Sequence, residues 1–136
     1  MNEFSAWYES IKNDVDHMDA LIKMPRSTDG ECLFAELDGL IQWLARSAEL
    51  VSIAESMFKQ KISTIILEYS TKDLTPSLLV KVAEGICFEE LKGYRRIERQ
   101  NAGLVHAIEG IRTLLSFYKE TMKMNNVNQG NKYDKK

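Results

Sequence analysis

The chain has 136 residues, of which 44% are hydrophobic, so it is long and apolar enough to fold as one domain with a real core. Its 18 basic and 20 acidic residues leave a formal charge of -2, which excludes a strong overall attraction to nucleic acid or anionic lipid. The sequence contains no run of about 18 apolar residues, which a membrane-spanning helix would need. Its first residues also lack the basic segment followed by an apolar run that is typical of a signal peptide. We therefore expect a cytoplasmic protein without membrane contact.

Residues 2–24 are predicted to form the first helix, because their apolar side chains recur at helical spacing. These side chains are Phe4, Trp7, Tyr8, Ile11, Val15, Met18, Leu21 and Ile22. Pro25 ends the pattern, and Thr28 with Glu31 has the spacing of a capping box, in which each side chain bonds a free amide of the other residue. The second helix should therefore begin near residue 29.

Residues 29–70 are predicted to form one long helix with two apolar stripes. The main stripe keeps an alternating spacing of three and four: Phe34, Leu37, Ile41, Leu44, Ala48, Val51, Phe58, Ile62, Ile65 and Tyr69. The neighbouring stripe is Leu33, Leu40, Trp43, Ser47, Leu50, Ala54 and Met57. Two stripes require two neighbours, so we expect the main stripe to face a second long helix and the other stripe to face the first helix.

Residues 76–124 are predicted to form the third helix, which begins at Pro76 behind the capping hydroxyl of Thr75. Its heptads match those of the second helix, which predicts a left-handed, coiled-coil-like antiparallel hairpin. Gly85 and Gly93 each weaken a helix, so a kink or break between them is possible. Residues 125–136 lack apolar periodicity and are predicted to form a disordered tail.

The predicted fold class is thus all-α: a long antiparallel hairpin with a shorter N-terminal helix packed on it, in a single domain of residues 1–124. The far half of the hairpin is more apolar than two helices can bury, which predicts self-association into a dimeric helical bundle. The residues expected in that interface are Ile62, Ile66, Ile86, Phe88 and Leu91. The alternative is that the third helix folds back at one of its glycines and covers the patch.

Two glutamates interrupt the apolar stripes at about the same level of the hairpin, Glu55 and Glu90. Paired carboxylates suggest a metal or acid–base site, but the Glu-x-x-His motif of helical di-metal sites does not occur in the sequence. We therefore predict partial exposure or pairing with Lys59, Lys92 or Arg95, and no metal site, catalytic residue or cofactor. Asn101 lies in an apolar heptad run, which predicts a role in setting helix register.

Four basic residues lie on one side of the third helix: Lys92, Arg95, Arg96 and Arg99. Such a cluster could contact nucleic-acid phosphates. Glutamates are interleaved at helical spacing, however, which is equally typical of a solvated, salt-bridged face. Nucleic-acid binding through these residues is therefore the alternative function.

Three short runs carry a resemblance to known sequences: Trp43-Leu-Ala-Arg-Ser47, Gly110-Ile-Arg-Thr-Leu-Leu-Ser116 and Lys123-Met-Asn-Asn126. In these runs the chain resembles small uncharacterised helical proteins encoded in prophage regions of gut bacteria. The resemblance implies a phage or mobile-element setting and no particular activity. We predict a non-enzymatic interaction or scaffold protein whose protein partner the sequence does not identify.

Overall fold

The computed structural model describes residues 2–134, with side chains through residue 128, and every regular element in this range is a helix. The predicted all-α class is therefore confirmed. The helices are α1 (Glu3–Ser10), α2 (Lys12–Lys23), α3 (Gly30–Tyr69), α4 (Pro76–Ile86) and α5 (Phe88–Asp134). No described helix combines the length and the apolar character that crossing a membrane requires.

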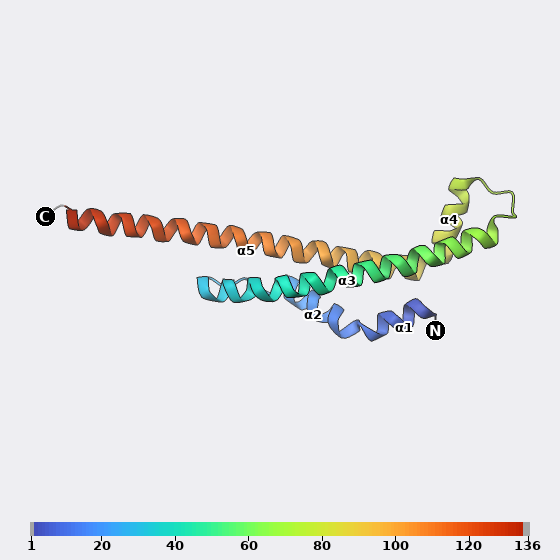
Figure 1. Ribbon diagram of the computed structural model, residues 1–136, viewed down its shortest axis with the longest axis horizontal. Helices are drawn as coiled ribbons and strands as arrows, with labels where there is room; N and C mark the ends of the chain where they lie inside the picture. Colours follow the sequence, from blue (N-terminus) through green and yellow to red (C-terminus); the bar gives the residue numbers. More distant parts are fainter. Residues whose placement is uncertain (1, 135–136) are drawn as a thin grey trace.

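The two longest helices, α3 and α5, lie side by side and run in opposite directions, while α1 and α2 lie along one side of them (Figure 1). Apolar side chains from α1, α2, α3 and α5 meet in one core. Its buried members are Phe4, Ile11, Val15, Met18, Leu33, Leu40, Leu50, Ala54, Ile97, Leu104, Ile108, Ile111 and Leu115.

Both stripes of α3 were expected to be covered, but the structure buries the neighbouring stripe more fully than the main one. The buried residues of α3 are Gly30, Leu33, Leu40, Ser47, Leu50 and Ala54, which belong mostly to the neighbouring stripe. In the main stripe, Phe34 is 54% exposed and Ile41 is 42% exposed. The distance between packed helices depends on the side chains at the contact, so small residues such as Ser47 and Ala54 favour a close approach on this side. The less apolar stripe is therefore the more buried one.

The predicted first helix is divided at Ile11, which has φ −104° and ψ 5° and separates α1 from α2. Just before it, the Ser10 hydroxyl donates a hydrogen bond to the carbonyl oxygen of Trp7 at 2.5 Å. Such bonds compete with the helical backbone pattern and often bend a helix. The helix after the Pro25 connection is capped by Asp29, which accepts from the Glu31 amide, and not by Thr28 as expected.

The predicted third helix is also divided, at Cys87, within the Gly85 to Gly93 region where a break was possible. α4 begins as predicted, since the Thr75 hydroxyl accepts from the Leu78 amide and Pro76 follows the cap. Cys87 has φ −94° and ψ 27°, and α4 leaves the direction of α5 at this point (Figure 1).

α5 continues to Asp134, so residues 125–134 are helical where a disordered tail was expected. Once a helix is formed, each added residue gains one hydrogen bond for one residue fixed, so a polar segment without proline can extend it. Residues 135 and 136 of the predicted tail lie outside the described residues. The first turn of α3 lies level with Tyr118, whose ring is close to Gly30, and α5 runs on past it (Figure 1).

Candidate functional site

The four basic residues predicted as a possible nucleic-acid site lie near the start of α5, but they differ in their ion pairing. The Arg96 guanidinium pairs with the Asp19 carboxylate on α2 at 3.0 Å. Lys92, Arg95 and Arg99 are exposed and form no ion pair with any carboxylate that the structure describes. Three of the four charges are thus available to solvent, while the fourth holds α2 against α5.

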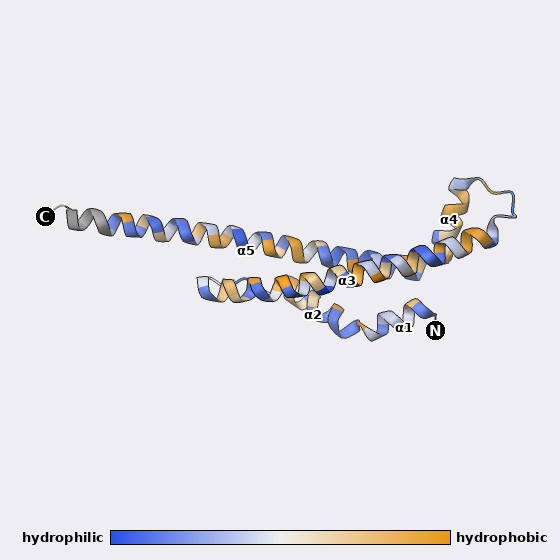
Figure 2. Cartoon of the chain, viewed as in Figure 1, coloured by the Kyte–Doolittle hydropathy of each residue, from blue (hydrophilic) through white to orange (hydrophobic). Residues whose placement is uncertain are grey.

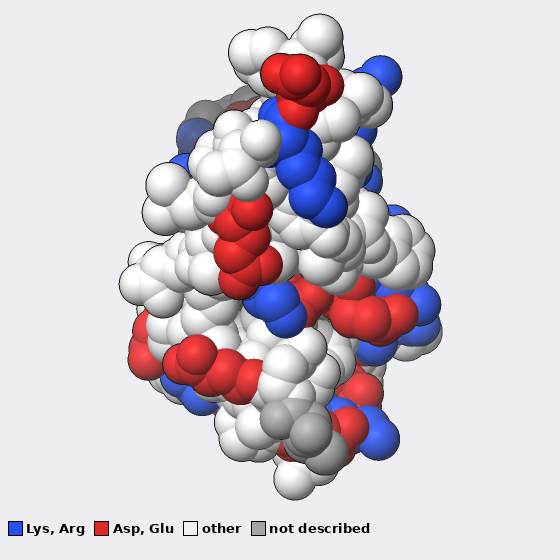
Figure 3. Space-filling model, turned by 90° about the vertical axis from the view of Figure 1, so that its right-hand side faces the viewer, with Lys and Arg blue, Asp and Glu red and all other residues white. Residues whose placement is uncertain are grey.

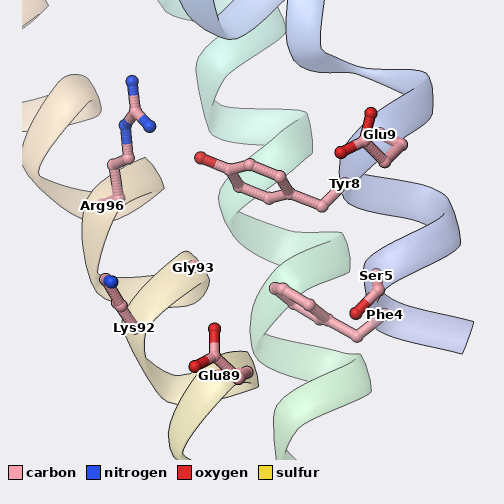
Figure 4. A pocket seen from close by; sticks show the side chains of 8 residues that line it. All are labelled: Phe4, Ser5, Tyr8, Glu9, Glu89, Lys92, Gly93 and Arg96. Carbon is pink, nitrogen blue, oxygen red and sulfur yellow. The ribbon is translucent and has the colours of Figure 1, made fainter. Parts of the chain in front are cut away.

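An open groove of about 300 Å³ lies between α1 and α5, next to Arg96. The rings of Phe4 and Tyr8 point from α1 toward α5, where Lys92 and Arg96 flank Gly93 (Figure 4). A Cβ atom on Gly93 would lie only 2.6 Å from Cε1 of Phe4. The absence of a side chain at residue 93 therefore allows α1 to dock here.

A buried polar cluster joins α2 to α5 and was missed by the sequence reasoning. Gln100 is 4% exposed, and its amide nitrogen donates to Oδ1 of Asp19 at 2.7 Å and to the carbonyl oxygen of Val15 at 2.8 Å. The hydrogen bond from Gln100 is the largest influence on the pKa of Asp19 and holds it below its ordinary value of 3.8, with Arg96 acting in the same direction. The same carboxylate raises the pKa of Arg96.

Asn101, the residue expected to set the helix register, is half-buried and makes no side-chain hydrogen bond among the described residues. Instead, the neighbouring Gln100 makes side-chain hydrogen bonds, and they join α5 to α2. Both residues are polar positions in the apolar run of α5. The heptad pattern alone does not say which of two adjacent polar residues points toward α2.

The two glutamates that interrupt the stripes have separate lysine partners. Glu55 pairs with Lys59 on the same helix at 2.5 Å, as one of the expected pairings had it. Glu90 is 2% exposed and pairs with Lys61 of α3 at 2.5 Å, while the Asn2 side-chain amide donates to it at 2.9 Å. Among the described residues, no group of three His, Cys, Asp or Glu side chains forms a candidate metal site.

The residues expected to mediate self-association differ in exposure. Ile86 is 46% exposed and Phe88 is 57% exposed, whereas Ile62, Ile66 and Leu91 are half-buried. Apolar residues gather in α4 and in the last turns of α3 (Figure 2). Viewed from this end, acidic and basic side chains are interleaved around uncharged surface (Figure 3).

A second uncovered surface follows one side of α3, and we call it the open stripe. Its members recur at spacings of four and three: Phe34, Asp38, Ile41, Ala45, Ala48, Ser52, Glu55, Lys59, Ile62 and Ile66. All are exposed or half-buried. α2 contacts α3 through Trp43, which lies against His17, and Arg46, which pairs with Asp14. Helical periodicity places Trp43 and Arg46 on the side of α3 opposite the open stripe.

Comparisons of the chain with models of protein families, with curated proteins and with solved structures found no match. The function of the chain must therefore be inferred from the surfaces described above. Two of them are apolar surfaces of helices, and the buried polar side chains of Gln100 and Glu90 bond groups on neighbouring helices.

Proposed function

We propose that this chain is a non-enzymatic interaction protein that assembles with other protein chains, including a second copy of itself, through apolar helix surfaces. The observation that carries the proposal is that the fold leaves large apolar side chains exposed on α3, at the junction of α4 and α5, and on the part of α5 from Leu114 onward. Phe34 and Ile41 project from the open stripe, and Ile86 and Phe88 project at the junction of α4 and α5. Clusters of exposed apolar side chains typically mark protein interfaces.

The proposal includes the homodimer and the coiled-coil-like hairpin expected from the sequence. An antiparallel pair of long helices with an uncovered face gains buried apolar surface when another helix packs on it, and a dimeric bundle provides such a helix. A phage or mobile-element setting, suggested by the resemblance of three short runs, is also part of the proposal. No catalytic step or cofactor is invoked.

Sedimentation equilibrium over a wide concentration range tests the proposal. We expect the wild type to assemble and at least one of Ile41→Glu, Ile66→Glu and Phe88→Glu to be monomeric with unchanged helicity by circular dichroism. Gln60→Glu on α3 is the matched control, because residue 60 is exposed and helical periodicity places it on another side of α3 than the open stripe. A wild type that is monomeric at every concentration would overturn the proposal.

A second candidate function is nucleic-acid binding, favoured by the exposed and unpaired positions of Lys92, Arg95 and Arg99. Phosphate contacts of this kind weaken steeply as the salt concentration rises. We expect such binding to be lost in the double variant Arg95→Glu with Arg99→Glu and retained in Lys81→Glu, a matched reversal on α4. Absence of binding to single- and double-stranded DNA at low salt would remove this candidate.

A further inference from the structure

The open stripe of α3 has an internal order that indicates what covers it. Small residues occupy its centre, where Ala45, Ala48 and Ser52 are all exposed. Large apolar residues lie toward both ends, Phe34 on one side and Ile62 on the other. The charged residues lie between the centre and the ends: Asp38 toward Phe34, and Glu55 with Lys59 toward Ile62.

We propose that a second copy of this chain binds the open stripe with its own open stripe, in antiparallel orientation, with a two-fold axis at Ala48. The inference builds on the proposed function, of which it specifies one interface. In this arrangement Phe34 meets Ile62 of the second copy, Ala45 meets Ser52, and Ala48 meets its own counterpart. Ile41 lies opposite Glu55, whose carboxylate bonds Lys59 of its own helix. A two-fold interface must be self-complementary, and this order satisfies that requirement.

Charge complementarity selects the antiparallel orientation. Reversal about Ala48 brings Asp38 of each copy to Lys59 of the other, so two opposite-charge pairs form per dimer. A parallel pair in register would instead place each charge against its like, which disfavours that arrangement. Lys59 already bonds the Glu55 carboxylate at 2.5 Å, so its amine is held near the stripe.

The size of the central residues also fits a helix crossing. Alanine and serine allow two helix axes to approach closely, because the axial separation depends on the side chains at the contact. The stretch from Phe34 to Ile62 is about 40 Å long at the helical rise. The larger residues at its ends therefore lie away from the crossing point, where they can pack against those of the second copy. The patch at Ile86 and Phe88 is not part of this interface and provides an internal control.

Charge reversal tests the orientation. We expect Asp38→Lys and Lys59→Glu to weaken the dimer about tenfold each at low salt, and the double variant to restore it. The measurement is sedimentation equilibrium, with Phe88→Glu as a control that leaves the dimer intact. If both single reversals leave the dissociation constant unchanged, the inference is wrong.

Disulfide trapping tests the register in a Cys32→Ser background, which removes the exposed native thiol. Ala48→Cys should form a covalent dimer under mild oxidation. Asp38→Cys and Lys59→Cys should cross-link when mixed and much less when alone. A dimeric wild type without these cross-links overturns the inference and leaves the proposed function standing, whereas a monomeric wild type overturns both.

Discussion

The side-chain amide of Gln100 on α5 donates a hydrogen bond to the backbone carbonyl oxygen of Val15 on α2, 2.8 Å away. The same nitrogen reaches Oδ1 of Asp19, so one buried group contacts two successive levels of α2. An α2 shifted along α5 by a turn would leave this amide without partners in an apolar core. The contact therefore fixes the position along α5 at which α2 docks.

Replacing Gln100 with leucine should lower the free energy of unfolding by about 1–3 kcal/mol, because Asp19 then loses its main hydrogen-bond donor. Asn101→Leu is the matched control: the residue is half-buried without a hydrogen bond among the described side chains, so we expect little loss. Urea unfolding measures both changes. Equal losses in the two variants would contradict the role assigned to Gln100.

Asp19 should make stability depend on pH in the acid range. Its pKa lies below the ordinary value of 3.8 in the folded chain, so its contribution is complete above pH 3.8 and is lost as the pH falls through the folded-state pKa. We expect Asp19→Asn to be less stable than the wild type at neutral pH and nearly equal to it in strong acid. Urea unfolding at both pH values measures this, and a gap that persists in acid would argue against it.

The two glycines Gly93 and Gly110 should respond oppositely to alanine. A Cβ at residue 93 would clash with the buried ring of Phe4, so Gly93→Ala should cost about 1–3 kcal/mol and loosen α1. Nothing lies within 4 Å of a Cβ at residue 110, so Gly110→Ala should add about 1 kcal/mol through helix propensity. Urea unfolding and hydrogen exchange in α1 measure the difference. A gain in both variants would show that Phe4 does not pack as described.

Lys61 and Glu90 should behave as a coupled pair. Lys61→Met leaves the Glu90 carboxylate, which is 2% exposed, with Asn2 as its remaining partner, and should cost about 3 kcal/mol. The double variant Lys61→Met with Glu90→Leu should recover most of that loss, because it removes both charges. Additive losses in a double-mutant cycle would show that the pair is not coupled.

The positions of the long helices were predictable from the sequence because heptad spacing, the Thr75 cap and Pro76 are local signals. The choice between the two stripes of α3 was not. Spacing identifies both stripes but does not rank them by burial, and two of the fully buried residues are small ones, Ser47 and Ala54. Their low hydrophobicity made the buried stripe look like the secondary one.

Glu55 has one of its expected partners, Lys59, but the expected level of Glu90 on the hairpin was wrong for a related reason. Glu55 and Glu90 were placed at one level by treating residues 76–124 as a continuous helix that starts directly after the turn. The break at Cys87 makes α4 a separate helix and shifts the pairing of α5 with α3 by about two turns, so that Glu90 meets Lys61 and Phe58 stacks on Tyr94. Helix breaks of this kind depend on tertiary packing.

The continuous course of α5 has a mechanical consequence. A helix of 47 residues rises about 70 Å, well beyond the breadth of a compact protein of this chain length. A partner bound near Phe88 would therefore be held at a fixed distance from a partner bound near the other end of α5. Under the proposed function, α5 would therefore act as a spacer between partners as well as a binding surface.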